Sequence, residues 1–363
     1  MCITRKINKH DDKLFSWGIA LLCCTIVFIV IEIKYPFFFL RDDNADSFIA
    51  DYMYGIRCMS EGKFPFYCFN EFGGQRFFAA GQTGLLNPLV IFSADLSLLV
   101  CGKPDLLIDI LAYISIILGC TGSFFLIKKL GCSDLSAIVG SIAWVFNAYN
   151  IWEGTSWLIV VYTTSVFPFF LLTSLILLEK NSIRNYFFAI IPRVYLFYLG
   201  HPQFFIFASV FDCIFTGVLC LLMNKQRWHK LLTLIRDYLF VYVSTTFLVL
   251  PLLIPEYQYT LLTNGYDSAR TYENLLLEMD FEKPAFYFPF LYTEETYKLF
   301  YPPFIGFLLM SFLFAGLLLL FFLHLKKPEG KLKKLEITMF ATVPCIVLSY
   351  LILFSRDAIR IIS

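Results

Sequence analysis

Charged side chains are scarce in this chain. Lysine, arginine, aspartate and glutamate make up 16% of its 363 residues, whereas a soluble domain carries about a quarter. Hydrophobic residues make up 58%, 42 residues are phenylalanine, and the mean hydropathy is +0.70. Apolar runs recur at the length of roughly 20 residues that a helix needs to cross the hydrocarbon core of a bilayer. The composition excludes a soluble protein and predicts an all-α, polytopic transmembrane helical bundle.

Motifs for nucleic-acid, metal and nucleotide binding are also missing. The net charge is +1 and no basic tract with interleaved aromatics lies in a polar segment, which excludes a nucleic-acid partner. The 11 cysteines form no CxxC motif or Cys/His cluster with metal-ligand spacing. Gly73-Gly74 lacks the Gly-Lys-Ser/Thr continuation of a phosphate-binding loop. Cys58 and Cys68 share one polar loop, where the sequence is consistent both with a disulfide and with two free thiols.

Nine apolar segments are predicted to span the membrane. They cover residues 16–38, 106–127, 135–150, 157–178, 186–200, 203–223, 231–254, 302–325 and 336–354. No small-residue cleavage pattern follows the first segment, so it is interpreted as a transmembrane helix rather than a signal peptide. Residues 85–101 are also apolar, but Asn87, Pro88 and Asp95 interrupt them. This segment is therefore predicted to be interfacial or re-entrant.

Clusters of lysine and arginine predict the orientation of these spans. The clusters lie at residues 5–13, 128–129, 180–184, 225–236 and 326–334. Nine spans place all five clusters on one side, as the positive-inside rule requires, whereas a tenth span at 85–101 would place the later ones opposite the N-terminus. The N-terminus is therefore predicted to be cytoplasmic. Residues 1–363 then form a single transmembrane domain with two large extracytoplasmic loops, 39–105 and 255–301.

The first of these loops begins with an acidic stretch, FFFLRDDNADSF, which contains Asp42, Asp43 and Asp46. A carboxylate at the membrane surface could act as a general base on a substrate whose other half lies in the bilayer. Asp and Asn are also strong helix N-cap residues. A capping role for these aspartates therefore stays open beside the catalytic one.

A series of short motifs follows in the same loop. Gly62-Lys63-Phe64-Pro65-Phe66, Gly73-Gly74, Gln82-Thr83-Gly84 and Asn87-Pro88 precede an apolar segment. This pattern resembles the first loop of the bacterial YfhO-like membrane proteins, which belong to the GT-C glycosyltransferase superfamily. The resemblance extends over roughly residues 15–275 and is weaker beyond the first loop. YfhO-like chains are usually longer, so a truncated, non-catalytic partner of a glycosylation complex is an alternative.

The resemblance implies a GT-C fold and transfer of a sugar from a polyprenyl-phosphate donor to a cell-envelope polymer. The donor is expected to be an undecaprenyl-phosphate sugar, the acceptor a cell-wall polymer such as teichoic acid, and the location the bacterial plasma membrane. In GT-C enzymes the acidic residue at this position of the first loop is catalytic or linked to a metal. Asp42 or Asp43 is thus expected to be the base. No cofactor is certain, and a divalent cation near Asp42, Asp43 and Asp46 is an open alternative.

Further residues are predicted to bind substrate: Asp46, Arg76, Glu153, His201 and Arg270. Glu153 lies between aromatic residues in the turn NAYNIWEGTSW, and His201 lies at a helix break in YLGHPQFF. Arg76 and Arg270 compete as partners of the donor phosphate, since a guanidinium group matches phosphate oxygens in a bidentate manner. The structural alternatives are an interfacial charge for Glu153, a turn residue for His201 and solvated loop side chains for the two arginines.

A membrane transporter or flippase of lipid-linked sugars is the second functional class. Such a protein would carry charged residues inside its spans and would repeat its halves. The predicted spans contain Glu32 and Lys34 near the outer end of the first, Asp109 at the mouth of the second, and Asp212 near the centre of the sixth. No convincing internal repeat is found. The bilayer is a partner in every interpretation, and a further membrane subunit stays open.

Overall fold

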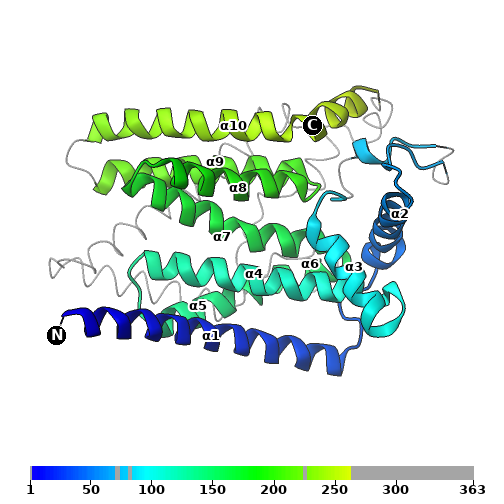
Figure 1. Cartoon of the computed structure of the whole chain (residues 1–363), viewed down its shortest axis with the longest axis horizontal. Coiled ribbons are helices and arrows are strands. Elements are labelled where there is room, and N and C mark those ends of the chain that lie inside the picture. The colour runs from blue at the N-terminus through cyan, green and yellow to red at the C-terminus, as the bar shows by residue number, and fades with distance from the viewer. Residues whose placement is uncertain (1, 70–73, 81–83, 224–226, 263–363) are drawn as a thin grey trace, which may run out of the picture.

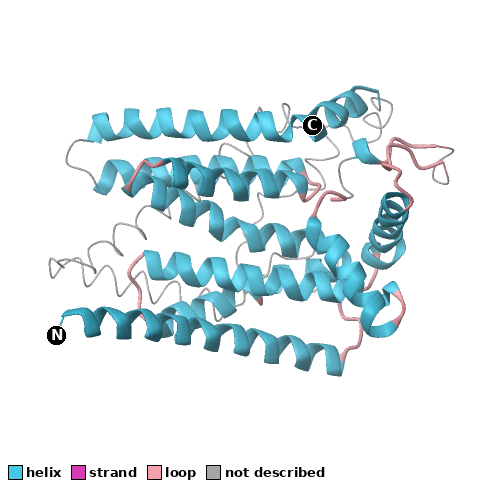
Figure 2. Ribbon diagram, viewed as in Figure 1, coloured by secondary structure: helices cyan, strands magenta, loops and turns pink. Residues whose placement is uncertain are grey.

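The computed structural model describes residues 2–69, 74–80, 84–223 and 227–262, which form a bundle of helices (Figure 1). These residues contain no β-strand, and one isolated antiparallel bridge joins Cys68 to Gln75. Short loops connect the helices (Figure 2). The all-α prediction is confirmed for this part of the chain. The predicted spans 302–325 and 336–354 and most of the loop 255–301 lie outside the described residues.

One set of helices runs side by side along the bundle, and a second set gathers at one end of it (Figure 1). The former are α1 (Cys2–Lys34), α4 (Leu107–Lys129), α5 (Asp134–Val145), α7 (Leu158–Glu179), α8 (Ile183–Tyr198), α9 (Pro202–Met223) and α10 (Arg227–Leu262). The latter are η1 (Asn44–Phe48), α2 (Ile49–Ser60), η2 (Phe78–Ala80), α3 (Pro88–Cys101), η3 (Pro104–Leu106) and α6 (Ala148–Ser156).

Among the described residues, six helical segments are long and apolar enough to cross a membrane. They are Lys13–Lys34, Pro104–Lys129, Asp134–Ser156, Leu158–Glu179, Pro202–Leu221 and His229–Tyr259. The chain is therefore a multi-pass membrane protein. The predicted span 186–200 corresponds to α8, which has 16 residues, and the interfacial segment 85–101 corresponds to α3, which has 14. Both are shorter than the roughly 20 residues of an untilted span. The count of about nine spans stays a prediction.

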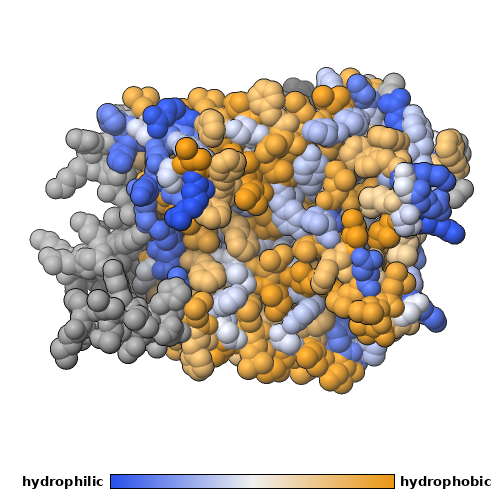
Figure 3. Space-filling model, viewed as in Figure 1, coloured by the Kyte–Doolittle hydropathy of each residue, from blue (hydrophilic) through white to orange (hydrophobic). Residues whose placement is uncertain are grey.

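The alternating direction of the long helices brings the basic segments together. The start of α1, the end of α4, the end of α7 and the start of α10 lie at one end of the bundle (Figure 1), which we call the basic end. Lys129 Nζ lies 2.5 Å from Glu179 there, and Lys13 Nζ lies 4.9 Å from the centre of the Phe125 ring. The opposite end, with α2, α3 and α6, is called the loop end. An apolar band separates the two ends (Figure 3).

Helix α4 is the central element of the bundle and packs against α1, α3, α5 and α7. A Cβ atom at Gly119 would lie only 3.0 Å from the Cα atom of Ser165, so the glycine allows α4 and α7 to approach closely. Small residues at such contacts are typical of membrane helices, whose association depends on close packing. This α4–α7 contact supports the α6–α7 turn at the loop end, where the candidate site lies.

Candidate functional site

The acidic residues predicted to be catalytic lie on a short connection between α1 and η1, residues 35–43, which we call the acidic strap. Its backbone turns through two left-handed residues, Phe37 (φ 57°) and Asp42 (φ 47°), a region that non-glycine residues seldom occupy. The hydroxyl of Ser156 donates a 2.8 Å hydrogen bond to Asp42 Oδ2. Asp42 and Asp43 are both exposed. The strap thus presents two carboxylates at the loop end, and one of them is fixed by a residue of α6.

Asn44 anchors the strap and is fully buried. Its Nδ2 group donates to the carbonyl oxygens of Phe39 at 2.8 Å, Gly154 at 2.8 Å and Thr155 at 3.0 Å. Its Oδ1 atom accepts a 2.9 Å bond from the backbone N–H of Leu158. One side chain therefore joins the strap to the α6–α7 turn. This role is not recognisable in the sequence, because the α6–α7 turn lies more than 100 positions away in the chain.

Asp43 and Asp46 follow the same connection into η1. Asp43 occupies the N-cap position of η1 but its side chain makes no capping hydrogen bond. Asp46 is exposed in the first turn. The capping alternative therefore does not describe the side chain of Asp43 in this structure. The choice of Asp42 or Asp43 as base stays a prediction.

Glu153 and His201 lie near the same α6–α7 turn. Glu153 is half-buried on α6, one turn before Ser156. The ring of Trp157, the next residue, lies 5.6 Å from the ring of His201. His201 is 9% exposed and its Nδ1 atom has no hydrogen-bond partner among the described residues. Burial lowers the pKa of His201, which favours a neutral imidazole that offers a hydrogen bond rather than a positive charge.

The remaining predicted residues are less closely connected to the strap. Arg76 is half-buried next to the fully buried Phe77, in the short described segment 74–80. Arg270 lies outside the described residues. Cys58 and Cys68 are both free thiols rather than a disulfide. The described part of the chain contains no group of three or more His, Cys, Asp or Glu residues that could hold a metal ion.

A second polar site lies inside the bundle. Arg193 of α8 and Asp212 of α9 form an ion pair with 2.5 Å between Nη2 and Oδ2, and their side chains are 1% and 0% exposed. Arg193 also donates a 2.7 Å hydrogen bond to Ser174 of α7. The rings of Tyr238 and Tyr242 lie 5.8 and 5.4 Å from its guanidinium carbon. Asp212 was among the charges expected inside the spans, whereas Arg193, a lone cation within the predicted span 186–200, was not.

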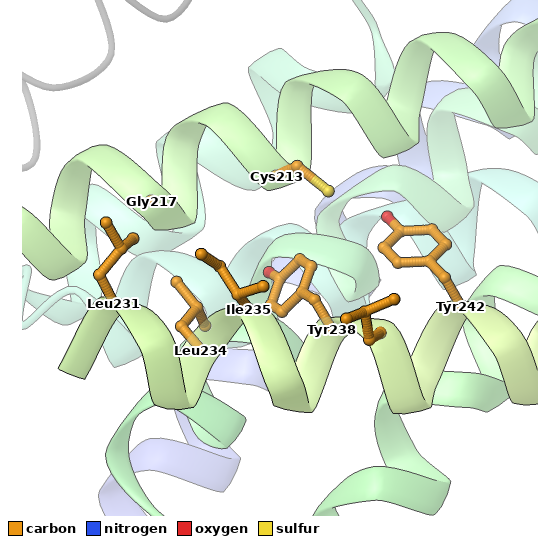
Figure 4. A pocket seen from close by; sticks show the side chains of 8 residues that line it. Cys213, Gly217, Leu231, Leu234, Ile235, Tyr238 and Tyr242 are labelled. Atoms are coloured by element: carbon orange, nitrogen blue, oxygen red, sulfur yellow. The ribbon is translucent and has the colours of Figure 1, made fainter. Parts of the chain in front are cut away.

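An apolar groove of about 320 Å³ lies beside this ion pair, between α9 and α10. Cys213 of α9 and Leu234 and Ile235 of α10 line it, together with the two tyrosines that contact Arg193 (Figure 4). The tyrosine rings thus separate the groove from the buried charges. The groove lies closer to the basic end of the bundle than to the loop end, because it is near the start of α10 (Figure 1).

Comparisons with known proteins do not place the chain in a family: no family model, no curated protein and no solved structure matches it. A functional assignment therefore depends on the residues of the acidic strap and on the resemblance of the first loop.

Proposed function

We propose that this protein is an outer-leaflet glycosyltransferase of GT-C type, which moves a sugar from a polyprenyl-phosphate donor to a cell-envelope polymer or glycan. The observation that carries the proposal is the acidic strap. Asp42 and Asp43 are exposed directly beyond the first membrane helix, while Ser156 and Asn44 fix their connection to the α6–α7 turn. A base for this reaction must be both held in place and adjacent to the bilayer that contains the donor lipid.

In the proposed reaction these residues have distinct roles. The acceptor hydroxyl attacks the anomeric carbon of the donor, the carboxylate of Asp42 or Asp43 takes the hydroxyl proton, and the bond from the anomeric carbon to the phosphate oxygen breaks. The departing polyprenyl phosphate gains negative charge, which an arginine would stabilise. Arg76 and Arg270 are the candidates for that role. Asp46, Glu153 and the neutral His201 would form hydrogen bonds to the sugar or the acceptor.

The proposal includes a topology. The N-terminus and the basic end face the cytoplasm of a bacterial cell, the loop end faces outward across the plasma membrane, and residues 302–325 and 336–354 complete about nine spans. The gathering of basic segments at the end opposite the acidic strap supports this orientation (Figure 1). A polyprenyl donor in the outer leaflet would then meet the strap at the level of its phosphate.

The test measures sugar transfer in membranes from a strain that lacks its own copy of the protein. The membranes receive radiolabelled undecaprenyl-phosphate sugars, and label in the envelope polymer is counted. We expect Asp42→Asn or Asp43→Asn to lower the rate by about 100-fold or more, because a general base contributes on that order. Asp95→Asn, which changes an exposed aspartate of α3, is the matched control. Full transfer by both strap variants at normal protein level would refute the proposal.

A transporter of lipid-linked sugars is the second candidate, and the buried Arg193–Asp212 pair is the observation that favours it. Ionisable residues inside a membrane bundle are often part of a transport pathway. Reconstituted liposomes with a fluorescent lipid-linked sugar distinguish the two functions. A transporter moves the lipid between leaflets with no acceptor present, and the Arg193→Leu/Asp212→Leu double variant, which leaves no uncompensated buried charge, abolishes that movement. A glycosyltransferase leaves the distribution of the lipid unchanged.

A further inference from the structure

Two carboxyl groups meet under the acidic strap. Glu32 is near the end of α1 and Asp109 near the start of α4, and the two carboxyl groups lie close enough to interact with each other. Each carboxyl group also accepts a hydrogen bond from the backbone of the strap. The backbone N–H of Phe37 donates a 3.1 Å bond to Glu32 Oε2, and that of Phe39 donates a 2.9 Å bond to Asp109 Oδ1. The pair therefore connects two membrane helices with the segment that carries Asp42.

The other oxygen of each carboxyl group lacks a donor. Glu32 Oε1 and Asp109 Oδ2 are both buried and have no hydrogen-bond partner among the described residues. Asp109 as a whole is 4% exposed. Phe28 lies one turn before Glu32 on α1, its ring stacks on that of Phe39 with 6.1 Å between the centroids, and the two residues are 8% and 0% exposed. Apolar walls of this kind exclude the water that would otherwise solvate two negative charges.

Neighbouring charges do not compensate for two carboxylates. Arg41 of the strap is the cationic group that interacts with Glu32, and its guanidinium carbon lies 5.2 Å from the centre of the Phe38 ring on the exposed side of the strap. Within the described part of the chain, the charged group that acts on Asp109 is Glu32. Two carboxylates in contact cannot both ionise readily, and such pairs typically retain one proton between them.

We propose that Glu32 and Asp109 form a binding site for one proton, which is taken up from water and shared between the two carboxyl groups. One group, as the acid, donates its O–H to the unpaired oxygen of the other, as the carboxylate. This single hydrogen bond satisfies both buried oxygens and leaves the other two oxygens free to accept from Phe37 and Phe39. The shared proton thus fastens α1 to α4 beneath the acidic strap, whether the protein transfers sugars or transports them.

Infrared spectroscopy of the full-length protein in lipid nanodiscs at neutral pH tests this site. We expect a carboxylic-acid C=O band that shifts in D₂O, and the Glu32→Gln/Asp109→Asn double variant loses intensity equal to one carboxylic acid per chain. The amides keep the oxygens that accept from the backbone N–H groups of Phe37 and Phe39. Asp105→Asn, which changes an exposed carboxyl group of η3, is the control and leaves the acid band unchanged.

Three results would overturn the assignment. An unchanged acid band in the double variant would mean that both groups are ionised, and a loss equal to two acids would mean that each holds its own proton. Elemental analysis could also find one metal ion per chain in the wild type and none in the double variant. That result would mean that the site binds a cation and not a proton. Should the double variant fold poorly, the single Asp109→Asn variant repeats the measurement: the proton either leaves or stays on Glu32 without its carboxylate partner, so the acid band must disappear or shift, and a band unchanged in both position and intensity contradicts the site.

Discussion

The guanidinium of Arg193 and the carboxylate of Asp212 form an ion pair that is almost completely withdrawn from the surface, with 1% and 0% of the side chains exposed. Arg193 comes from α8 and Asp212 from α9, and Ser174 of α7 accepts a further hydrogen bond from the same guanidinium. Three helices therefore meet at one charged contact. Because neither charge is solvated, each depends on the other for compensation.

Removal of either partner is expected to be far more damaging than removal of both. Arg193→Leu or Asp212→Leu leaves one uncompensated buried charge and is expected to lower the free energy of unfolding by about 3–5 kcal/mol. The double variant replaces the pair by apolar groups and is expected to lose much less. Unfolding in denaturing detergent, analysed as a double-mutant cycle, measures the difference. Arg57→Leu is the control, because the side chains of Arg57 and of its partner Glu61 are 81% and 49% exposed. A double variant as unstable as the sum of both singles would contradict the prediction.

Asn44 provides a second prediction, because its two polar atoms have different tasks. Asn44→Asp keeps the shape of the side chain but replaces the Nδ2 donor by a carboxylate oxygen that faces the carbonyls of Phe39, Gly154 and Thr155. Each buried group left without its partner costs about 1–3 kcal/mol, so the variant is expected to lose several kcal/mol of stability and to release the strap.

Limited proteolysis of the loop end and thermal unfolding in detergent measure the effect of Asn44→Asp. Asp43→Asn introduces the reverse change at an exposed neighbouring position and is expected to leave both the cleavage pattern and the melting temperature unchanged. If Asn44→Asp melts with the wild type, the asparagine does not anchor the strap.

The membrane helices could be predicted from the sequence far better than the contacts between them. Segments 106–127, 157–178 and 203–223 correspond closely to α4, α7 and α9, since a long apolar run directly reflects the bilayer as solvent. Arg193 was overlooked because one charge is diluted in an apolar window of many residues. The role of Asn44 could not be predicted, because it requires knowing that the strap meets the α6–α7 turn, which is more than 100 positions away in the chain.

Gly84 tests the contact between the first loop and the connection from α8 to α9. Its φ is 54°, and a Cβ atom there would lie 2.6 Å from the carbonyl oxygen of Leu199. Gly62 has a similar φ of 71° but open space around it, so the two glycines form a matched pair. Gly62→Ala is expected to cost only the backbone strain of about 1–2 kcal/mol. Gly84→Ala adds a steric clash with the backbone, typically another 1–3 kcal/mol.

Thermal unfolding of the two glycine variants under the same conditions measures this difference in stability. A larger drop in the melting temperature for Gly84→Ala indicates that the loop end packs against the α8–α9 connection. Equal drops would mean that the contact at Leu199 is not formed, and the path of the first loop across the bundle would need revision.

The proposed orientation predicts which of two natural cysteines can be reached from outside the cell. Cys101 is exposed at the end of α3 on the loop end, and Cys132 is half-buried between α4 and α5 on the basic end. In variants that retain only one of these cysteines, a membrane-impermeant maleimide is expected to label Cys101 in intact cells and Cys132 only after permeabilisation. Labelling of Cys132 in intact cells would place the basic end outside and would remove the acidic strap from the outer leaflet.

The pH dependence of this labelling separates topology from reactivity. Burial raises the pKa of the Cys132 thiol above its usual value of about 9, against a smaller opposing effect of Lys128. The thiolate is the reactive form, so labelling of Cys132 in permeabilised cells is expected to accelerate as the pH rises toward that pKa. In intact cells the rate should stay near zero while the external pH rises, since the reagent cannot reach the thiol. A pH-dependent increase in intact cells would show that Cys132 faces outward and reacts slowly only because of its burial.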